Sequence, residues 1–244
     1  MTGRRLPGER NMKTGAVVLA GGSGSRMHAD VKKQYMLIGG KPVLYYSLQV
    51  FQNSDRIDEI VLVCSKEDIA VCQKEIVEKY GFTKVIRIVA GGKERYHSVY
   101  EGLKALEDCE YVMIHDGARP FVDGPMLERI AEALPFVQAC TVGMPVKDTI
   151  KLSGPDGCVD ETLPRERLWA IQTPQAFSYR LIRDAHDEVA RGNAQGLKIT
   201  DDAMLVEYIG KKRVKLIEGS YENIKITTPD DLLLAEVILS HRKK

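Results

Sequence analysis

The sequence predicts an α/β fold in which a mostly parallel sheet is flanked by helices. Short apolar runs, unbroken by polar alternation, are typical of strands buried on both faces. Helical patterns separate these runs, and this alternation is typical of parallel sheets with right-handed crossovers. The expected strands span residues 16–20, 60–64, 85–90 and 111–115. The expected helices between them span residues 43–52, 66–80 and 96–106.

The second half of the chain predicts one more helix and then a change of pattern. Residues 125–134 form a helical pattern with Pro125 in the first turn, where proline is tolerated. Two extended stretches joined by the turn SGPDG predict an antiparallel arm over about 140–170 that projects from the sheet. The remaining expected elements are helices at 179–191 and 201–208, strands at 214–218 and 223–227, and a last helix from Pro229.

Composition and charge limit the classes of function. The chain has 244 residues, of which 44% are hydrophobic and 28% charged, and we expect a single globular domain over 13–244. Residues 1–12 lack the apolar segment of a secretory signal and predict a disordered extension. A net charge of +1 does not favour nucleic acid, and no apolar stretch approaches the roughly 20 residues of a membrane span. Five dispersed cysteines without a CxxC pair indicate reduced thiols and a cytoplasmic location.

A glycine-rich loop, within LAGGSGSRM, follows the first expected strand. Glycines at the carboxyl end of a strand let a ligand approach the backbone, whose exposed N–H groups bind phosphate oxygens. Arg26 adds a positive charge beside the loop. The stretch therefore predicts an anion-binding cradle, although an ordinary tight turn would fit the same glycines. The small residues of this cradle are Ala20, Gly21, Gly22 and Gly24.

Two common phosphate-binding motifs do not match this loop. It lacks the GK[ST] ending of a P-loop, and Met27 stands where the third glycine of the dinucleotide-binding motif belongs. Lys33 follows seven residues after Arg26, and two cations that flank a glycine loop suit a triphosphate. A solvated charge is the alternative interpretation of Lys33, and it is the expected one for Lys32.

Two later stretches place charged residues at or near the ends of expected strands. In YVMIHDGARPF, Asp116 can help to bind Mg²⁺, and Arg119 offers a planar guanidinium for phosphate. A structural ion pair between Asp116 and Arg119 is the alternative. In NIKITTPDD, Lys225 lies inside the apolar strand expected at 223–227, where a lysine requires a carboxylate or a bound phosphate as its partner.

Eight motifs, in order, resemble those of the 2-C-methyl-D-erythritol 4-phosphate cytidylyltransferases, from about Ala16 to the last helix. They are LAGGSGSRM, KKQY, AGGKERYHSV, HDGARPF, PVKDT, WAIQTPQAF, ITDDA and NIKITTPDD. The resemblance implies a Rossmann-like nucleotidyltransferase fold and a homodimer that uses Mg²⁺ and CTP. It also implies transfer of CMP from CTP to 2-C-methyl-D-erythritol 4-phosphate, with release of pyrophosphate, in isoprenoid precursor synthesis.

The resemblance further implies a role for each matching residue. The implied catalytic residues are the transition-state cations Arg26 and Lys33, together with Arg165 and Lys225. The implied nucleotide contacts are Ala20, Gly21, Gly22, Gly24, Gly92, Ser98, Asp116 and Gly117, with Asp116 also at the metal. The implied sugar-phosphate contacts are Arg119, Thr149, Thr173 and Thr200. Arg165 lies on the expected arm and is implied to reach the neighbouring subunit's site, so that the homodimer shares its active sites.

Three other functions share part of this pattern. A ribitol-5-phosphate cytidylyltransferase has the same fold and most of the motifs, but that class tends to carry a bulkier residue than Gly117 and Phe in place of Tyr35. Met27 and Lys33 disfavour an NAD-dependent oxidoreductase. The complete set of cations disfavours a non-catalytic nucleotide-binding regulator.

Two residues depart from the family pattern. Lys32 stands where proline is frequent, which predicts a looser approach to Lys33. Lys93 stands where an acidic residue is frequent, so no nucleotide contact is expected from it.

Overall fold

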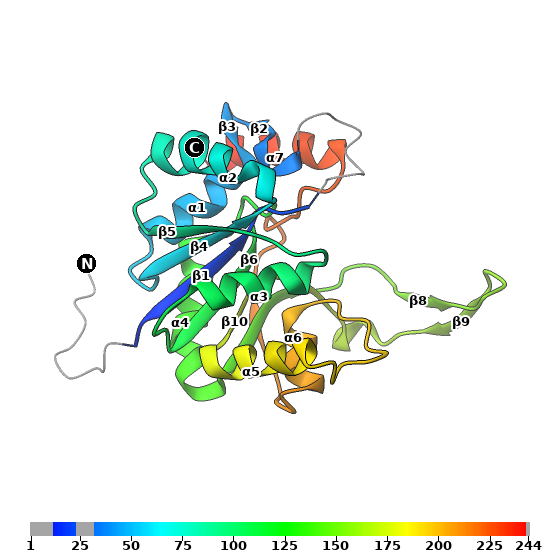
Figure 1. Ribbon diagram of the computed structural model, residues 1–244. Helices are drawn as coiled ribbons and strands as arrows, with labels where there is room; N and C mark the ends of the chain where they lie inside the picture. Colours follow the sequence, from blue (N-terminus) through cyan, green and yellow to red (C-terminus); the bar gives the residue numbers. More distant parts are fainter. Residues whose placement is uncertain (1–11, 23–31, 243–244) are drawn as a thin grey trace.

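A seven-stranded sheet forms the centre of the computed structural model, which describes residues 12–22 and 32–242 (Figure 1). The strand order is β11-β7-β10-β6-β1-β4-β5. Only β10 runs antiparallel to its neighbours β6 and β7, and the other pairs in this sheet are parallel. The expected mostly parallel sheet is therefore confirmed. The strands are β1 (Thr14–Leu19), β4 (Glu59–Cys64), β5 (Val85–Ala90), β6 (Tyr111–Asp116), β7 (Ala139–Pro145), β10 (Trp169–Ser178) and β11 (Lys215–Glu218).

Helices cover both faces of the sheet, and alternate residues of β1 face two separate cores. Ala16 and Val18 pack in the core that includes residues of α1 and α4. Val17 and Leu19 pack in the core that includes residues of α3 and α5. Burial on both faces explains why this strand is a continuous apolar run. The helices are α1 (Val43–Asn53), α3 (Arg95–Ala105), α4 (Gly124–Val137), α5 (Tyr179–Ala190), α6 (Asp202–Tyr208) and α7 (Pro229–Arg242).

The helix expected at 66–80 is present, but its geometry is irregular. It begins as a 3₁₀ turn at Lys66–Asp68, continues as α2 (Ile69–Val71) and ends as π-helix at Cys72–Glu78. Its buried side chains join the core that α1 and α4 line. A small hairpin, β2 (Leu37–Ile38) and β3 (Lys41–Pro42), leads into α1.

An antiparallel hairpin projects from the sheet between β7 and β10 (Figure 1). Its strands are β8 (Lys151–Ser153) and β9 (Val159–Thr162), and every residue of both is exposed. The chain reverses at Gly157, whose φ of +81° favours glycine. Residues 139–145 and 169–178 belong to the central sheet, so the projecting arm is limited to residues 146–168.

The strand expected at 223–227 is wrong. These residues form no ladder in the described part of the chain, and Ile226 N donates a hydrogen bond to Ala118 O at 2.8 Å. Instead, Arg119 Nη1 donates a hydrogen bond to the Asn223 carbonyl oxygen at 2.8 Å. A run of apolar residues indicates burial, and residues 223–227 are indeed buried or half-buried, but it does not show that the backbone pairs with another strand.

Within residues 12–22 and 32–242, no helix combines the length and the apolar character needed to cross a bilayer.

Candidate active site

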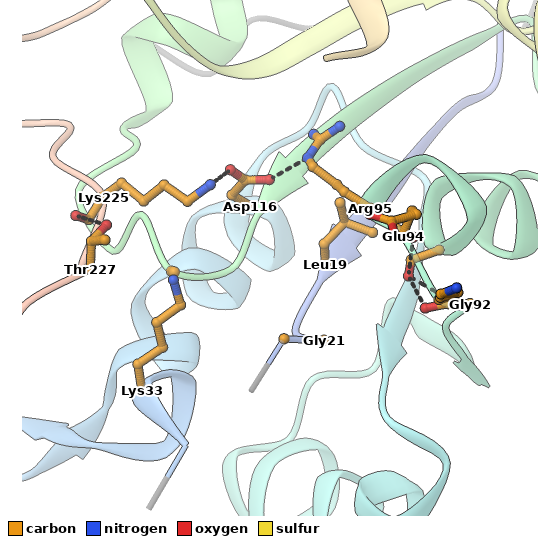
Figure 2. Close-up of a pocket in the computed structure, with 13 residues that line it drawn as sticks. Leu19, Gly21, Lys33, Gly92, Glu94, Arg95, Asp116, Lys225 and Thr227 are labelled. Atoms are coloured by element: carbon orange, nitrogen blue, oxygen red, sulfur yellow. Dashed lines mark hydrogen bonds and ion pairs between the residues drawn. The ribbon is translucent and has the colours of Figure 1, made fainter. Parts of the chain in front are cut away.

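A pocket of about 340 Å³ lies where β1 and β6 end, between the loops that follow β1 and β5 and the loop before α7 (Figure 2). This is the edge of an open α/β sheet at which ligands bind. Arg95, the first residue of α3, also lines it, together with Lys93 and Glu94 just before the helix. The sequence-predicted residues that the structure brings together here are Gly21, Gly22, Lys33, Gly92, Ser98, Asp116 and Lys225.

Bare backbone forms the wall of the pocket after β1. Among residues 12–22 and 32–242, no atom lies within 4 Å of the position that a Cβ would take on Gly21 or Gly22, so this part of the chain leaves both residues open to ligand atoms. Gly22 has a φ of +116°, which glycine adopts without strain. Ala20 lies beneath this wall, is 1% exposed, and accepts a hydrogen bond at its carbonyl from Gln34 Nε2 at 2.6 Å.

Asp116 lies at the end of β6 between two cations, as Figure 2 shows. Its Oδ2 is 2.6 Å from Lys225 Nζ, and its Oδ1 is 3.1 Å from Arg95 Nε. Burial raises the pKa of Asp116, but Arg95 and Lys225 lower it more, and the pKa stays well below its usual range. Asp116 is therefore an ionised carboxylate, and Lys225 has the anionic partner that its apolar surroundings predicted.

Arg95 is the principal site residue that the sequence reasoning missed. It opens α3 and joins two carboxylates, because its Nη1 also lies 2.7 Å from Oδ2 of the fully buried Asp202. Burial lowers the pKa of Arg95, but Asp202 and Asp116 raise it further, so the guanidinium remains charged. The sequence did offer one signal: Arg95 lies in the motif AGGKERYHSV, and its partner Asp202 lies in the motif ITDDA.

The loop between β5 and α3 packs closely against the helix. A side chain at Gly92 would collide with Cβ of His97, so this position requires glycine. Ser98 Oγ accepts a hydrogen bond from Gly92 N at 3.1 Å, which fixes the loop at the rim of the pocket. Glu94 and His97 form a capping box that begins α3.

Thr173 is placed behind Asp116 and does not line the pocket. Its Oγ1 accepts a hydrogen bond from Asp116 N at 3.0 Å and lies 3.0 Å from His115 Nδ1. His115 Nε2 lies 3.1 Å from the carbonyl oxygen of Arg119, which can only accept, so Nε2 carries the proton and the Thr173 hydroxyl donates to Nδ1. Burial lowers the pKa of His115 to about 4, so this ring is neutral near pH 7.

Gly117 and Arg119 also support the site from outside the pocket lining. A Cβ on Gly117 would lie 2.7 Å from Leu44 Cδ1 and 2.9 Å from Leu19 O, so any side chain at this position would clash with its neighbours. The Arg119 guanidinium bonds to the Asn223 carbonyl and fastens the segment that carries Lys225. No direct Asp116–Arg119 ion pair is found between these two described residues; the cations on Asp116 are Arg95 and Lys225.

Three predicted residues lie on exposed segments away from the pocket lining: Thr149, Arg165 and Thr200. Arg165 Nη1 donates to Lys147 O at 2.8 Å, within the base of the arm. Gly24 and Arg26 fall outside the described residues. The expectation that Lys32 is a solvated charge is wrong, because its Nζ forms an ion pair with Asp68 Oδ2 at 2.7 Å.

Among the described residues, no group of three or more His, Cys, Asp or Glu side chains could hold a metal ion by itself. A metal at this site would have to take most of its ligands from elsewhere. Mg²⁺ is commonly held by one or two carboxylates together with substrate phosphates and water, and Asp116 supplies one ionised carboxylate. The residues present therefore fit a metal that arrives with a nucleotide.

The fold and this pocket together define a nucleotidyltransferase: bare glycine backbone, cations and one ionised carboxylate converge at the ligand-binding edge of an open α/β sheet. Comparison with known proteins identifies the family. The model of the 2-C-methyl-D-erythritol 4-phosphate cytidylyltransferase family matches residues 14–241, and the chain belongs to this family.

Similar proteins cover nearly the whole chain. A 2-C-methyl-D-erythritol 4-phosphate cytidylyltransferase from Clostridium kluyveri is 49% identical over 228 residues, which are 93% of this chain and 97% of that protein. One from Lachnoclostridium phytofermentans is 47% identical over 227 residues, 93% of this chain and 96% of that protein. The solved structure of 4-diphosphocytidyl-2C-methyl-D-erythritol synthase from Anaerococcus prevotii superimposes with a TM-score of 0.81 at 37% identity, covering 93% of this chain and 96% of that one.

Proposed function

We propose that this pocket is where the chain transfers CMP from CTP to 2-C-methyl-D-erythritol 4-phosphate and releases pyrophosphate. The observation that carries the proposal is the ionised Asp116, held by Lys225 and Arg95 in a pocket that Lys33 and the bare backbone of Gly21 also line. The family assignment supplies the substrates, and the relatives' names favour methylerythritol phosphate over ribitol 5-phosphate.

The reaction needs charge neutralisation more than it needs a base. A phosphate oxygen of the sugar phosphate attacks the α-phosphorus of CTP, a new P–O bond forms, and the bond to the β-phosphate oxygen breaks. A phosphate monoester with a second pKa of about 6 is mostly dianionic at pH 7, so the nucleophile is already deprotonated. Lys33, Lys225 and the N–H groups of Gly21 and Gly22 then bind and orient phosphate oxygens and stabilise the charge of the transition state.

Mg²⁺ completes this proposal as a partner of the nucleotide, with Asp116 as its protein ligand. The metal supplies further neutralisation of the triphosphate charge. Asp116 is suited to this role because Arg95 and Lys225 keep it ionised. A cytoplasmic location fits the free thiols of all five cysteines, four of which are buried.

The projecting arm supports a homodimer with shared active sites. A two-stranded hairpin is marginally stable by itself in water, and Leu152 and Val159 on this arm are 47% and 60% exposed. A two-fold dimer in which each arm packs on the other subunit would cover these side chains. Arg165, at the base of the arm and outside the pocket of its own chain, would then reach the partner subunit's sugar-phosphate site.

The substrate assignment is tested by pyrophosphate release. The purified protein with Mg²⁺ and CTP is expected to show a higher kcat/KM with methylerythritol phosphate than with ribitol 5-phosphate. Removing one transition-state cation, in Lys33→Ala or Lys225→Ala, should lower kcat by roughly 10²–10³ while circular dichroism stays unchanged. A higher kcat/KM with ribitol 5-phosphate would transfer the assignment to that substrate.

The shared site is tested by complementation. Chains with Arg165→Ala are mixed with chains with Lys33→Ala under conditions that allow subunit exchange. If sites are shared, both lesions fall in one site of each mixed dimer, and activity rises to at most about a quarter of wild type in a random equimolar mixture. No recovery despite verified exchange, or a monomer at assay concentration, would exclude sharing.

A further inference from the structure

The turn that carries Lys33 is held by its neighbours in sequence. Lys33 lies in a three-residue 3₁₀ turn, Lys33–Tyr35, which Lys32 precedes. Lys33 lines the pocket, whereas the side chains of Lys32, Gln34 and Tyr35 each bond to residues outside the turn. The position of the Lys33 backbone is thus fixed by three side chains that are not themselves pocket-lining.

Two of these three side chains converge on one oxygen atom. Lys32 Nζ is 2.7 Å from Asp68 Oδ2, and the Tyr35 hydroxyl donates to the same atom at 3.2 Å. Lys32 Nζ also donates to Ser65 Oγ at 2.7 Å. The Asp68 side chain is only 15% exposed, so this contact is well shielded from solvent. Glu67, by contrast, is 72% exposed and 3.5 Å from Lys32 Nζ.

The charges in this contact are stable at neutral pH. Burial raises the pKa of Asp68, but the hydrogen bond from Lys32 and further bonds from Ser65 and Tyr35 lower it more, leaving it below its usual value. The hydrogen bond to Asp68 raises the pKa of Lys32. Tyr35 makes a second contact on the same side, with its hydroxyl 3.1 Å from Cys72 Sγ.

The third side chain connects the turn to the floor of the pocket. Gln34 is 2% exposed, and its Nε2 donates to the Ala20 carbonyl at 2.6 Å. Ala20 directly precedes the bare glycines of the pocket wall. The turn is therefore attached on one side to the strand end that forms the cradle and on the other side to Asp68, at the start of the irregular helix.

We infer that Asp68 is a positioning residue for Lys33: its carboxylate holds the residues on both sides of Lys33 and so fixes where that positive charge lies in the pocket. This inference rests on the proposed catalytic role of Lys33. The Asp68 carboxylate is held on Lys32 and Tyr35, so we expect it to act through the turn and not on the substrate. A misplacement of about 1 Å at a catalytic group is enough to cost roughly 10²-fold in rate.

The test compares Asp68→Asn, which removes the charge and keeps the shape, with Glu75→Gln as a matched control. Glu75 pairs with Lys79 on the same irregular helix, and both side chains are more than half exposed. Asp68→Asn is expected to lower kcat by about 10-fold or more, with a smaller change in the KM for CTP, because the charge of Lys33 matters most in the transition state. Glu75→Gln is expected to leave kcat unchanged.

Two further variants separate positioning from general damage. Asp68→Glu keeps a carboxylate and should recover part of the kcat that Asp68→Asn loses. Lys32→Met breaks the same ion pair, so its effect and that of Asp68→Asn should not add in the double variant. A folded Asp68→Asn protein with normal kcat, or additive effects with Lys32→Met, would overturn the inference.

The same assay separates this inference from the proposed function. Lys33→Ala is measured beside Asp68→Asn. Near-normal kcat in Lys33→Ala would remove the proposed role of Lys33 and the inference with it. A large loss in Lys33→Ala together with wild-type kcat in Asp68→Asn would overturn the positioning role alone.

Discussion

Replacing Thr173 by valine tests whether its hydroxyl supports Asp116 or binds substrate. The substitution removes one hydroxyl and nearly preserves the shape of the side chain. Thr173 is 5% exposed, and its Oγ1 lies 3.0 Å from both Asp116 N and His115 Nδ1. In Thr173→Val, the N–H of Asp116 and the Nδ1 of His115 both lose their partner in a buried place.

The structure sets the size of the effect. An unsatisfied buried donor or acceptor costs about 1–3 kcal/mol, so the pair should lower the free energy of unfolding by about 2–6 kcal/mol. That is a large share of the roughly 5–15 kcal/mol that stabilises an ordinary domain. Thr173→Ser keeps the hydroxyl and is the control. Urea unfolding followed by circular dichroism measures the difference, and steady-state pyrophosphate release measures activity.

The two interpretations of Thr173 give different results. A supporting hydroxyl predicts lost stability and a lower kcat in Thr173→Val, because Asp116 is no longer held in place. A substrate-binding hydroxyl, which the family resemblance implied, predicts a raised KM for methylerythritol phosphate at unchanged stability. Wild-type unfolding of Thr173→Val would refute the hydrogen-bond assignment made from the structure.

Two further predictions concern stability. Burial chiefly lowers the pKa values of His115 and His186 to about 4, below the unfolded value of about 6.5. The unfolded chain therefore binds more protons between these limits, and the free energy of unfolding falls as pH drops from about 6.5 to 4, by about 3 kcal/mol per histidine. Urea midpoints at pH 7, 5.5 and 4.5 measure this fall, and a constant midpoint would contradict it. Gly117→Ala should cost about 1–3 kcal/mol through its contacts with Leu44 and Leu19 O. Gly124→Ala should cost nothing, because no atom of the described residues lies within 4 Å of the position of its new Cβ. Equal thermal midpoints of the two variants would exclude this packing argument.

Local patterns in the sequence predicted β1, β4 and β6 well because burial on both faces leaves a direct trace in composition. They did not place β7 and β10 in the central sheet, because residues 140–170 were expected to form the projecting arm. The run expected at 16–20 corresponds to β1 at Thr14–Leu19, and the run expected at 60–64 corresponds to β4 at Glu59–Cys64, in which every residue is buried. The same signal failed at 223–227. That segment is buried enough to be apolar, but a side chain, Arg119, bonds to its backbone where a strand would have had a neighbour. A hydrogen bond from a distant side chain to a backbone carbonyl leaves no periodic pattern in the local sequence, so it could not be predicted from that sequence.

The ionic contacts of the site were harder to predict because their partners are far apart in the sequence. Arg95 and Asp202 are separated by 107 positions, and Lys225 and Asp116 by 109. The apolar surroundings of Lys225 predicted that it needs an anion but not which one. Arg95 gave no comparable signal, since an arginine in the first turn of an amphipathic helix is most simply a solvated charge.

Under the proposed function, the arrangement of charges accounts for triphosphate binding by a chain whose net charge is only +1. Arg95 is committed to two carboxylates, and one of them, Asp202, is fully buried, so the guanidinium is part of the framework. Lys225 pairs through its Nζ with Oδ2 of Asp116, and its side chain is 39% exposed. A phosphate oxygen can therefore reach Lys225 without dismantling the buried pair. The arginine fixes the carboxylate, and the lysines provide the charge that a substrate can reach, which is why we expect Lys225→Ala to affect turnover more than folding.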